Sequence, residues 1–231
     1  MFKMFPPTFL LAPVAWLTVF LVTLMGAWTP LMASWGITPK TSWAILAVQA
    51  VFTLLLVTPA WRLLWRLIPP LNRWVFPDLN GEWDVEGATN WTRIDAVLKA
   101  ANRETRQKLD MRAGPEDQLP PLGRTLMRAE IRQSWMDIRV TLWDPTGGGP
   151  IDQSETLTVQ PFRGAHGRHG LVYVFEQKNR PDVHDDRSFF GAARIVVDRA
   201  DHDLLCGHMW SDRMWRRGMN TAAEIKFKRR S

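Results

Sequence analysis

Histidine and cysteine are the side chains from which a metal or nucleophilic site would be built, and they are scattered in this chain. His202, Cys206 and His208 place two possible metal ligands on one face of a predicted strand, but no second close pair completes a usual ligand set. The sequence contains no nucleophile-elbow, phosphate-loop or zinc-protease motif. We therefore expect a protein that is not an enzyme and that uses neither a metal nor a bound cofactor.

A second group of residues could hold a ligand without reacting with it. Successive side chains of a strand point to opposite faces, so the apolar residues on one face of the predicted strands are expected to point into the barrel. They are Val85, Ile131, Ile138, Val140, Leu157, Val159, Ile195, Ile225 and Phe227. Polar and aromatic residues share that face: Trp83, Gln133, Trp135, Tyr173, Ser211 and Arg213. An amide, hydroxyl or guanidinium inside a barrel must form hydrogen bonds with other groups or remain in contact with water. These six residues are therefore the ligand-binding candidates, with Asn179 at a strand end as a rim candidate.

Each candidate also has a purely structural alternative. Indole side chains bury a large surface area and often pack in the hydrophobic core. A tyrosine side chain can cover the end of a barrel with its hydroxyl at the rim. The alternatives are core packing for Trp83 and Trp135, a rim position for Tyr173, an ion pair with Asp212 or Asp198 for Arg213, and a mutual hydrogen bond or a buried water for Ser211 and Gln133.

The elements that must position these residues are short strands. Period-two runs rich in Val, Ile, Thr and aromatic residues are separated by Gly, Pro and Asp turns. They cover residues 82–87, 126–133, 135–143, 155–161, 171–177, 192–198, 205–211 and 223–228. We expect an eight-stranded up-and-down, lipocalin-like β-barrel over residues 77–231, because closure removes exposed strand edges and leaves room for one small ligand.

One insertion interrupts this meander. Thr92 and Asp95 have the spacing of a capping box, and apolar residues then recur near helical spacing. We expect an amphipathic helix over residues 92–111. It would pack as a lid over a barrel mouth or wall; the alternative, a role at the membrane surface, is less favoured because its polar face carries acidic as well as basic residues.

The N-terminal part of the chain has a membrane-like composition. Residues 8–28 and 42–61 are uncharged runs of 21 and 20 residues, each long enough to cross a hydrocarbon core of roughly 30 Å. A cleaved secretory signal is the alternative for the first run, but the run is longer than a usual signal core. We expect a two-helix transmembrane hairpin within residues 1–66, with helices over 8–28 and 42–65, and a short connector over 67–76.

Charge places the two ends of the hairpin on one side of the membrane. No acidic residue precedes Asp78, and the basic residues flank the pair of predicted spans, which predicts cytoplasmic termini. Residues 67–231 hold 25 Lys or Arg against 23 acidic residues, so their balance does not favour a nucleic-acid binder. The single Cys206 fits a reducing compartment.

Several motifs in this order resemble one family. They are residues 78–83 (DLNGEW), residues 131–135 (IRQSW), and residues 207–213 (GHMWSDR) followed by Gly218. Behind two predicted spans, this order resembles the SMODS-associated two-transmembrane, β-strand-rich effectors of bacterial CBASS antiphage systems. The long helix and Pro-Pro loop between the first two strands depart from the family pattern.

The resemblance implies a multi-pass effector of the bacterial inner membrane. Its cytosolic barrel would bind a cyclic dinucleotide made by a partner nucleotidyltransferase, and binding would drive homo-oligomerisation, membrane disruption and abortive infection. Such a ligand presents phosphates and stackable bases, which the cationic, amide and aromatic candidates above would suit. Two alternatives are a membrane-anchored carrier of a lipid or other apolar molecule, and a purely structural anchor.

Overall fold

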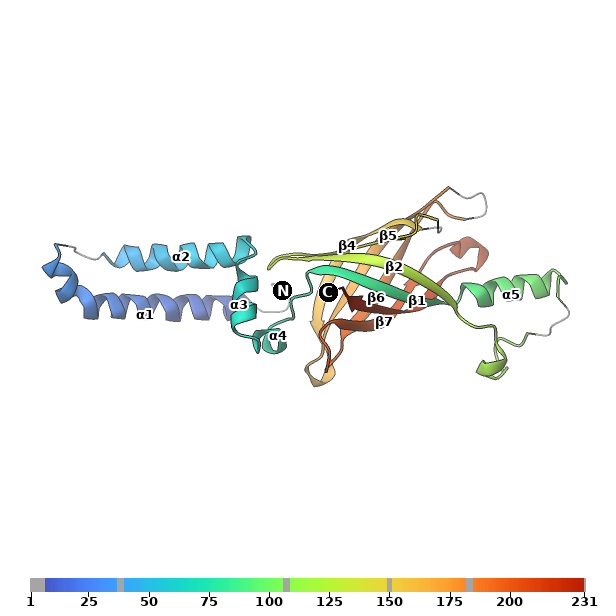
Figure 1. Ribbon diagram of the computed structural model, residues 1–231, viewed down its shortest axis with the longest axis horizontal. Coiled ribbons are helices and arrows are strands. Elements are labelled where there is room, and N and C mark those ends of the chain that lie inside the picture. The colour runs from blue at the N-terminus through green and yellow to red at the C-terminus, as the bar shows by residue number, and fades with distance from the viewer. Residues whose placement is uncertain (1–6, 37–39, 106–108, 149–150, 182–184, 231) are drawn as a thin grey trace. The chain divides into compact units, whose positions relative to one another are not determined.

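The chain forms two compact units in a computed structural model, which describes residues 7–36, 40–105, 109–148, 151–181 and 185–230. One unit contains Met1–Asp78 together with Gln133–Asp137, and the other contains Leu79–Arg132 with Ile138–Ser231. The first is helical and the second is a barrel (Figure 1).

The helical unit begins with α1 (Pro7–Ser34), and α2 (Thr41–Val57) returns beside it (Figure 1). Ala44 and Val48, one helical turn apart on α2, are the buried residues of that helix. The stretch Ala12–Ser34 of α1 is 23 residues long and apolar enough to cross a membrane. Long apolar side chains on both helices face outward, as expected of helices solvated by lipid.

The second predicted span is not one continuous helix. Helix α2 ends at Val57, and α3 (Trp61–Leu67) follows at an angle of 90°. Pro59 explains the break, because proline disfavours helical backbone in the residue before it, and Thr58 is extended at φ −106° and ψ 168°. The helix predicted over residues 42–65 is thus interrupted between Val57 and Trp61.

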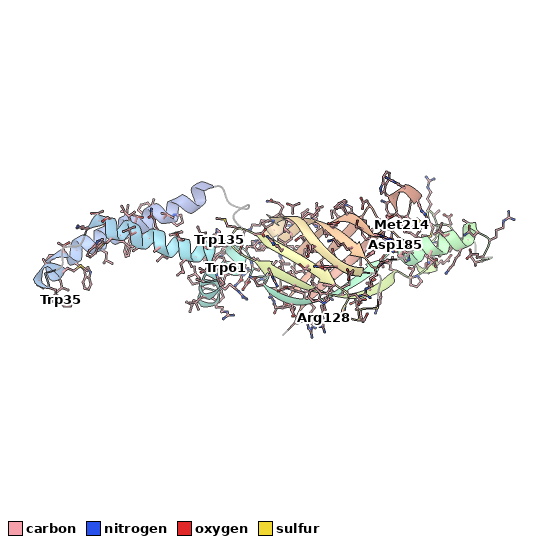
Figure 2. The ribbon with its side chains drawn as sticks, turned by 90° about the horizontal axis from the view of Figure 1, so that it is seen from above. Trp35, Trp61, Arg128, Trp135, Asp185 and Met214 are labelled. Carbon is pink, nitrogen blue, oxygen red and sulfur yellow. The ribbon has the colours of Figure 1, made fainter. Side chains whose placement is uncertain are left out.

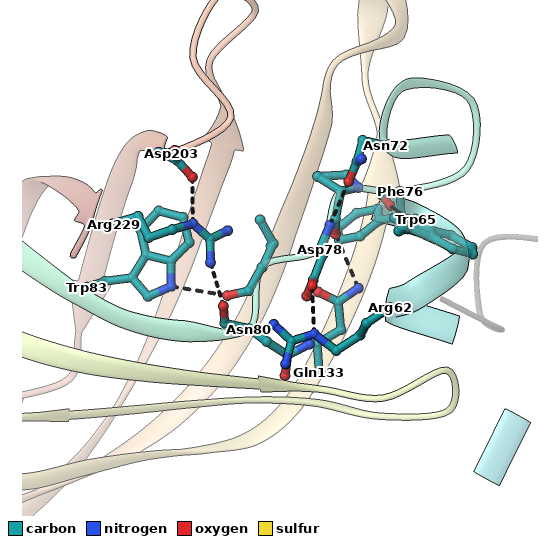
Figure 3. A network of polar contacts seen from close by, with 12 residues as sticks. Arg62, Trp65, Asn72, Phe76, Asp78, Asn80, Trp83, Gln133, Asp203 and Arg229 are labelled. Carbon is teal, nitrogen blue, oxygen red and sulfur yellow. Dashed lines mark hydrogen bonds and ion pairs between the residues drawn. The ribbon is translucent and has the colours of Figure 1, made fainter. Parts of the chain in front are cut away.

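The predicted connector folds back on α3 and contains a short helix, α4 (Leu71–Trp74). The Trp65 indole donates to the Phe76 carbonyl at 2.7 Å, and the Arg62 guanidinium contacts the Asp78 carboxylate at 2.8 Å (Figure 3). The Asn72 side chain accepts a hydrogen bond from the Asp78 amide. These contacts hold residues 72–78 against the helix.

The barrel closes through eight antiparallel strands in chain order. All eight predicted strands are present, which confirms the predicted barrel. The strands are β1 (Gly81–Thr89), β2 (Gly123–Gln133), β3 (Ile138–Trp143), β4 (Ile151–Arg163), β5 (His169–Asn179), β6 (Ser188–Val197), β7 (Leu204–Ser211) and β8 (Ala222–Arg229). Pairing of β1 with β8, for example Val85 with Phe227, closes the cylinder.

One inward assignment was wrong because β4 contains a bulge. Its register against β5 shifts between Thr156 and Thr158, so the side-chain parity changes there. Ser154 and Val159 are both buried, although they differ by an odd number of residues, and Leu157 is 58% exposed. The other eight apolar residues assigned to the interior are buried.

The inserted helix is shorter than predicted. Helix α5 spans Trp91–Ala101, and residues 109–111 are not helical; residues 106–108 lie outside the described residues. No capping box forms, because the Thr92 hydroxyl donates to the Pro121 carbonyl and Asp95 pairs with Lys99. The helix packs by its first turn and carries no fully buried residue.

Gly207 on β7 pairs with Ile195 on β6, and the space beside it has no room for a side chain. A Cβ at residue 207 would lie 1.9 Å from the Arg194 carbonyl oxygen, so Gly207→Ala forces the strands apart. We expect the free energy of unfolding to fall by about 3 kcal/mol in urea titrations of the detergent-solubilised chain. Gly148→Ala, whose nearest atom would be 3.8 Å away, should change it by less than about 0.5 kcal/mol. Equal stability of the two variants would contradict this account.

Candidate ligand-binding site

Strand β5 builds one wall of the candidate site. Its inward side chains run from Leu171 through Tyr173 and Phe175 to Gln177 and Asn179, and all five are buried. The strand therefore changes from aliphatic to aromatic to amide along its length. This gradient puts hydrogen-bonding groups at the end of the barrel where β5 finishes.

A cavity of about 190 Å³ lies at that end. Strands β1, β3, β5 and β7 finish there and the even-numbered strands begin there. Most of its wall is apolar, from Met127, Leu142, Phe175, Met209 and Ile225. Polar groups from Ser154, Gln177, Asn179 and Thr221 interrupt it. Tyr173 also lines the cavity, and burial raises the pKa of its phenol.

A chain of hydrogen bonds crosses the rim of the cavity. The Gln177 side-chain Nε2 donates to the Asn179 side-chain Oδ1 at 3.0 Å, and the Asn179 Nδ2 donates to Asp185 Oδ2 at 3.0 Å. Asp185 then accepts two bonds from Arg213, from Nε at 2.9 Å and from an Nη at 2.6 Å. The side chains of Arg213 and Asp185 are only 16% and 9% exposed. This is a bidentate and largely desolvated ion pair.

Arg213 is also stacked against aromatic rings. Its guanidinium carbon lies 4.2 Å from the centre of the Trp91 ring and 6.0 Å from that of Phe189. A guanidinium over an indole is a favourable cation–π arrangement. The rim therefore presents a planar cation and a flat aromatic surface next to one another.

The loop after β7 holds Arg213 in this position. Met214 has a left-handed backbone, with φ 49°, and its amide donates to an Asp186 oxygen at 2.6 Å. Figure 2 shows Asp185 and Met214 close together at the end of the barrel. On the other side of Arg213, the Asp212 carboxylate accepts a bond from the Phe190 amide at 2.7 Å. The Asp186 and Asp212 carboxylates thus hold the residues on both sides of Arg213 in place.

Trp91 is positioned by the chain segment that leaves β1. The Asn90 side chain accepts a hydrogen bond from the Ala222 amide at 3.0 Å, and the Trp91 amide donates to the Thr89 hydroxyl at 3.1 Å. These bonds tie the start of α5 to β8. Nearby, the hydroxyls of Ser211 and Thr221 lie 2.5 Å apart and are both buried.

The opposite end of the barrel is filled. Trp83 is fully buried, and its indole donates to the Leu79 carbonyl at 3.1 Å. The Arg229 guanidinium lies 4.4 Å from the Trp83 ring centre and donates to the Asn80 carbonyl and to Asp203 (Figure 3). This arrangement closes the apolar interior at the start of β1.

The structure brings together four of the seven predicted site residues. Tyr173, Asn179 and Arg213 line the cavity, and Ser211 bonds to its wall residue Thr221. Arg213 is paired, but with Asp185 and not with Asp212 or Asp198.

The other three predicted residues are not among the described residues that line the cavity. Trp83 fills the interior at the opposite end of the barrel, at the start of β1. The Gln133 side-chain amide donates to the Pro77 backbone carbonyl at 3.2 Å. The Trp135 ring packs edge-on against Trp65 in the helical unit, with the two ring centres 5.7 Å apart. Trp83 and Gln133 are buried, as their parity predicted, but parity does not say at which end of a strand a residue lies. Trp135 lies between β2 and β3, outside both strands, so its predicted inward position on a strand was wrong.

Sequence reasoning missed Trp91, Ser154, Gln177, Asp185 and Thr221. Gln177 carried a usable signal, because it follows Tyr173 and Phe175 at period two. Asp185 carried none, since it lies in a polar turn, 28 residues from the arginine that it contacts.

No site for a metal ion is found among the described residues, where no three His, Cys, Asp or Glu side chains gather. Cys206 is exposed, and His208 lies 3.8 Å from Glu224 on the outer surface. Known protein families give no assignment either: no family model matches the chain, and no curated protein matches it.

The buried rim pair predicts strong coupling between Arg213 and Asp185. A double-mutant cycle with Arg213→Ala and Asp185→Ala should give an interaction free energy of about 2 kcal/mol. Each single change leaves a desolvated charge without its partner. The exposed pair Arg132–Glu130, at 2.9 Å, is the matched control and should give a much smaller interaction free energy. Urea unfolding of the four chains in each cycle measures both values. Equal coupling in the two cycles would refute a desolvated pair at the rim.

Proposed function

We propose that this protein is a membrane-anchored receptor for a cyclic dinucleotide and acts as a CBASS-type antiphage effector. The observation that carries the proposal is the Arg213 guanidinium held between the Asp185 carboxylate and the Trp91 ring at the rim of an aromatic-lined cavity. A phosphate needs such a cation, and a base needs such a ring. The sequence resemblance supplies the ligand class.

A cyclic dinucleotide would lie only partly inside this cavity. Small-molecule sites usually measure about 300–1,000 Å³, whereas this cavity measures about 190 Å³. One base would enter between Phe175 and Phe189, with the Gln177 side chain beside its edge. The sugar-phosphate ring would then lie at the rim beside Arg213.

Ligand binding would involve an exchange of anions at Arg213. In the ligand-free protein Asp185 fills the position that a phosphate oxygen would take. A bound phosphate would replace Asp185 as the partner of the guanidinium, and Asp185 would be released together with its neighbour Asp186, which bonds the Met214 amide. Binding and rearrangement of this rim would thus be one event.

The effect on the membrane would follow from assembly. Liganded barrels would associate and concentrate the apolar helices α1 and α2 in the inner membrane, which would disrupt it and stop phage replication. A partner nucleotidyltransferase would supply the ligand. The exposed apolar surfaces of α1 and α2 support a role inside the bilayer.

Binding of a cyclic dinucleotide panel to the full chain in nanodiscs tests this function. Trp91→Ala should weaken binding by about tenfold, because the Arg213 guanidinium loses the ring that holds it in place, and Arg213→Ala should abolish it. Trp215→Ala is the matched control, because Trp215 also lies beneath an arginine, Arg216 at 5.6 Å, but does not line the cavity. The same ligand should release dye from vesicles carrying the unchanged chain. Failure of every cyclic dinucleotide to bind, or intact vesicles at saturation, would reject the proposal.

The anion exchange predicts a gain of affinity on removal of the competing carboxylate. Asp185→Asn keeps the shape of the side chain but weakens its bond to Arg213 by about 1 kcal/mol, so the ligand should bind about fivefold more tightly. Asp201→Asn removes the same charge in the turn between β6 and β7 and should leave affinity unchanged. Isothermal titration measures both. Weaker binding by the Asp185→Asn chain would show that the carboxylate contacts the ligand instead of competing with it.

A second candidate is a carrier of an apolar ligand, favoured by the Met127, Leu142, Phe175, Met209 and Ile225 wall. A carrier should retain lipid through purification, and Arg213→Ala should not affect it. Cyclic dinucleotides should then give no thermal stabilisation.

A further inference from the structure

The right angle between α2 and α3 fixes how α3 would lie beside a bilayer. Helix α2 has 17 residues, a length of about 25 Å, which is near the lower limit for a membrane span. Helix α3 leaves it at 90°. If α2 runs along the bilayer normal, α3 runs in the plane of the membrane, at its surface.

Helix α3 has two apolar faces, and only one is used for packing. Trp61 and Trp65, four residues apart, are 1% and 4% exposed. Leu63 and Leu67, also four residues apart, are 61% and 70% exposed. Residues at 100° intervals put the leucine pair nearly opposite the tryptophan pair. The tryptophan face meets Phe76 and Trp135, and the leucine face meets none of the described residues closely enough to be buried.

The exposed apolar surface continues beyond α3. Ile68 is 42% exposed, and Trp74 on α4 is 65% exposed. An indole near a span end is well suited to the headgroup boundary. An apolar surface of this kind, directly after a candidate span, is typical of a helix that lies in a membrane interface.

The charges beside this surface are basic. Arg66 on α3 and Arg73 on α4 are exposed, and Arg62 is paired with Asp78, the first acidic residue of the chain. Arg62 and Arg66 share one helical face, beside the leucine face. Long arginine side chains in this position reach lipid phosphates while their helix stays at the acyl boundary.

We propose that α3 and α4 form a binding site for anionic phospholipid at the membrane surface. Leu63 and Leu67 enter the boundary between headgroups and acyl chains, and Arg66 binds a lipid phosphate. This inference rests on the membrane anchoring in the proposed function and is independent of any ligand in the barrel. The occupant is a phospholipid headgroup of the surrounding bilayer, not a free phosphate.

A single-cysteine fluorescence experiment on the full chain tests the site. Cys206→Ser removes the single native thiol, and Leu67→Cys then carries an environment-sensitive fluorophore in vesicles of phosphatidylcholine and phosphatidylglycerol. We expect blue-shifted emission and strong quenching by lipids that carry a nitroxide near the headgroup. Leu126→Cys on β2 is the matched control, because Leu126 and Leu67 are both 70% exposed. Emission and quenching at residue 67 that equal those at residue 126 would overturn the proposal.

Headgroup preference is measured in the same chain by comparing quenching by nitroxide-labelled phosphatidylglycerol and phosphatidylcholine. The anionic lipid should be enriched about fivefold near residue 67, as expected for one arginine near the surface, and Arg66→Gln should remove this enrichment. Enrichment unchanged in Arg66→Gln would overturn the assigned role of this arginine. Free inorganic phosphate should not reduce the enrichment; competition by it would overturn the assignment to lipid.

A probe at Phe20→Cys on α1 separates failure of this inference from failure of anchoring. Phe20 is 60% exposed and lies within the apolar stretch of α1. Deep quenching at residue 20 with no quenching at residue 67 would overturn the surface site but keep the anchor. No quenching at residue 20 would overturn the anchor and, with it, the surface site.

Discussion

Closure of the barrel at one end is the constraint on which the candidate site depends. Trp83 fills the space at the start of β1, and Arg229 covers its ring while bonding the Asn80 carbonyl and Asp203. An eight-stranded barrel has an interior just wide enough for side chains or one small ligand. Because the bulk of the packing lies at the Trp83 end, the remaining space is left at the other end. The site is thus a consequence of where the large side chains are.

The rim of that space combines rigidity with a replaceable contact. Cation–π stacking on Trp91 and the bidentate bond to Asp185 hold Arg213 in one orientation, which lowers the entropy cost of using it to bind an anion. The bond to Asp185 also keeps the guanidinium satisfied when no ligand is present, since a desolvated charge without a partner is costly. In the proposed function, a ligand phosphate would take over this contact without leaving the arginine unpaired. The same geometry would then serve both folding and binding.

In the helical unit, the two faces of α3 have different roles. Tryptophans on one face of α3 hold the returning chain through Phe76 and Trp135, and Arg62 holds it through Asp78. The leucines on the other face are left for an apolar environment. Residues 133–137, which join β2 to β3, belong to this helical unit, so the chain of the second unit enters the first between two of its strands.

Period-two alternation determined the barrel strands from sequence, and hydropathy determined the apolar character of α1, because both signals depend on residues close together in the chain. Three of the cavity-lining candidates, Tyr173, Asn179 and Arg213, followed from the same local signal. The tertiary structure alone decided the rest. The bulge near Leu157 depends on pairing with β5, and the 90° bend after α2 depends on how the chain packs beyond Pro59. Trp91 and Asp185 meet Arg213 only after barrel closure brings distant strand ends together, and no local pattern encodes which strand ends become neighbours.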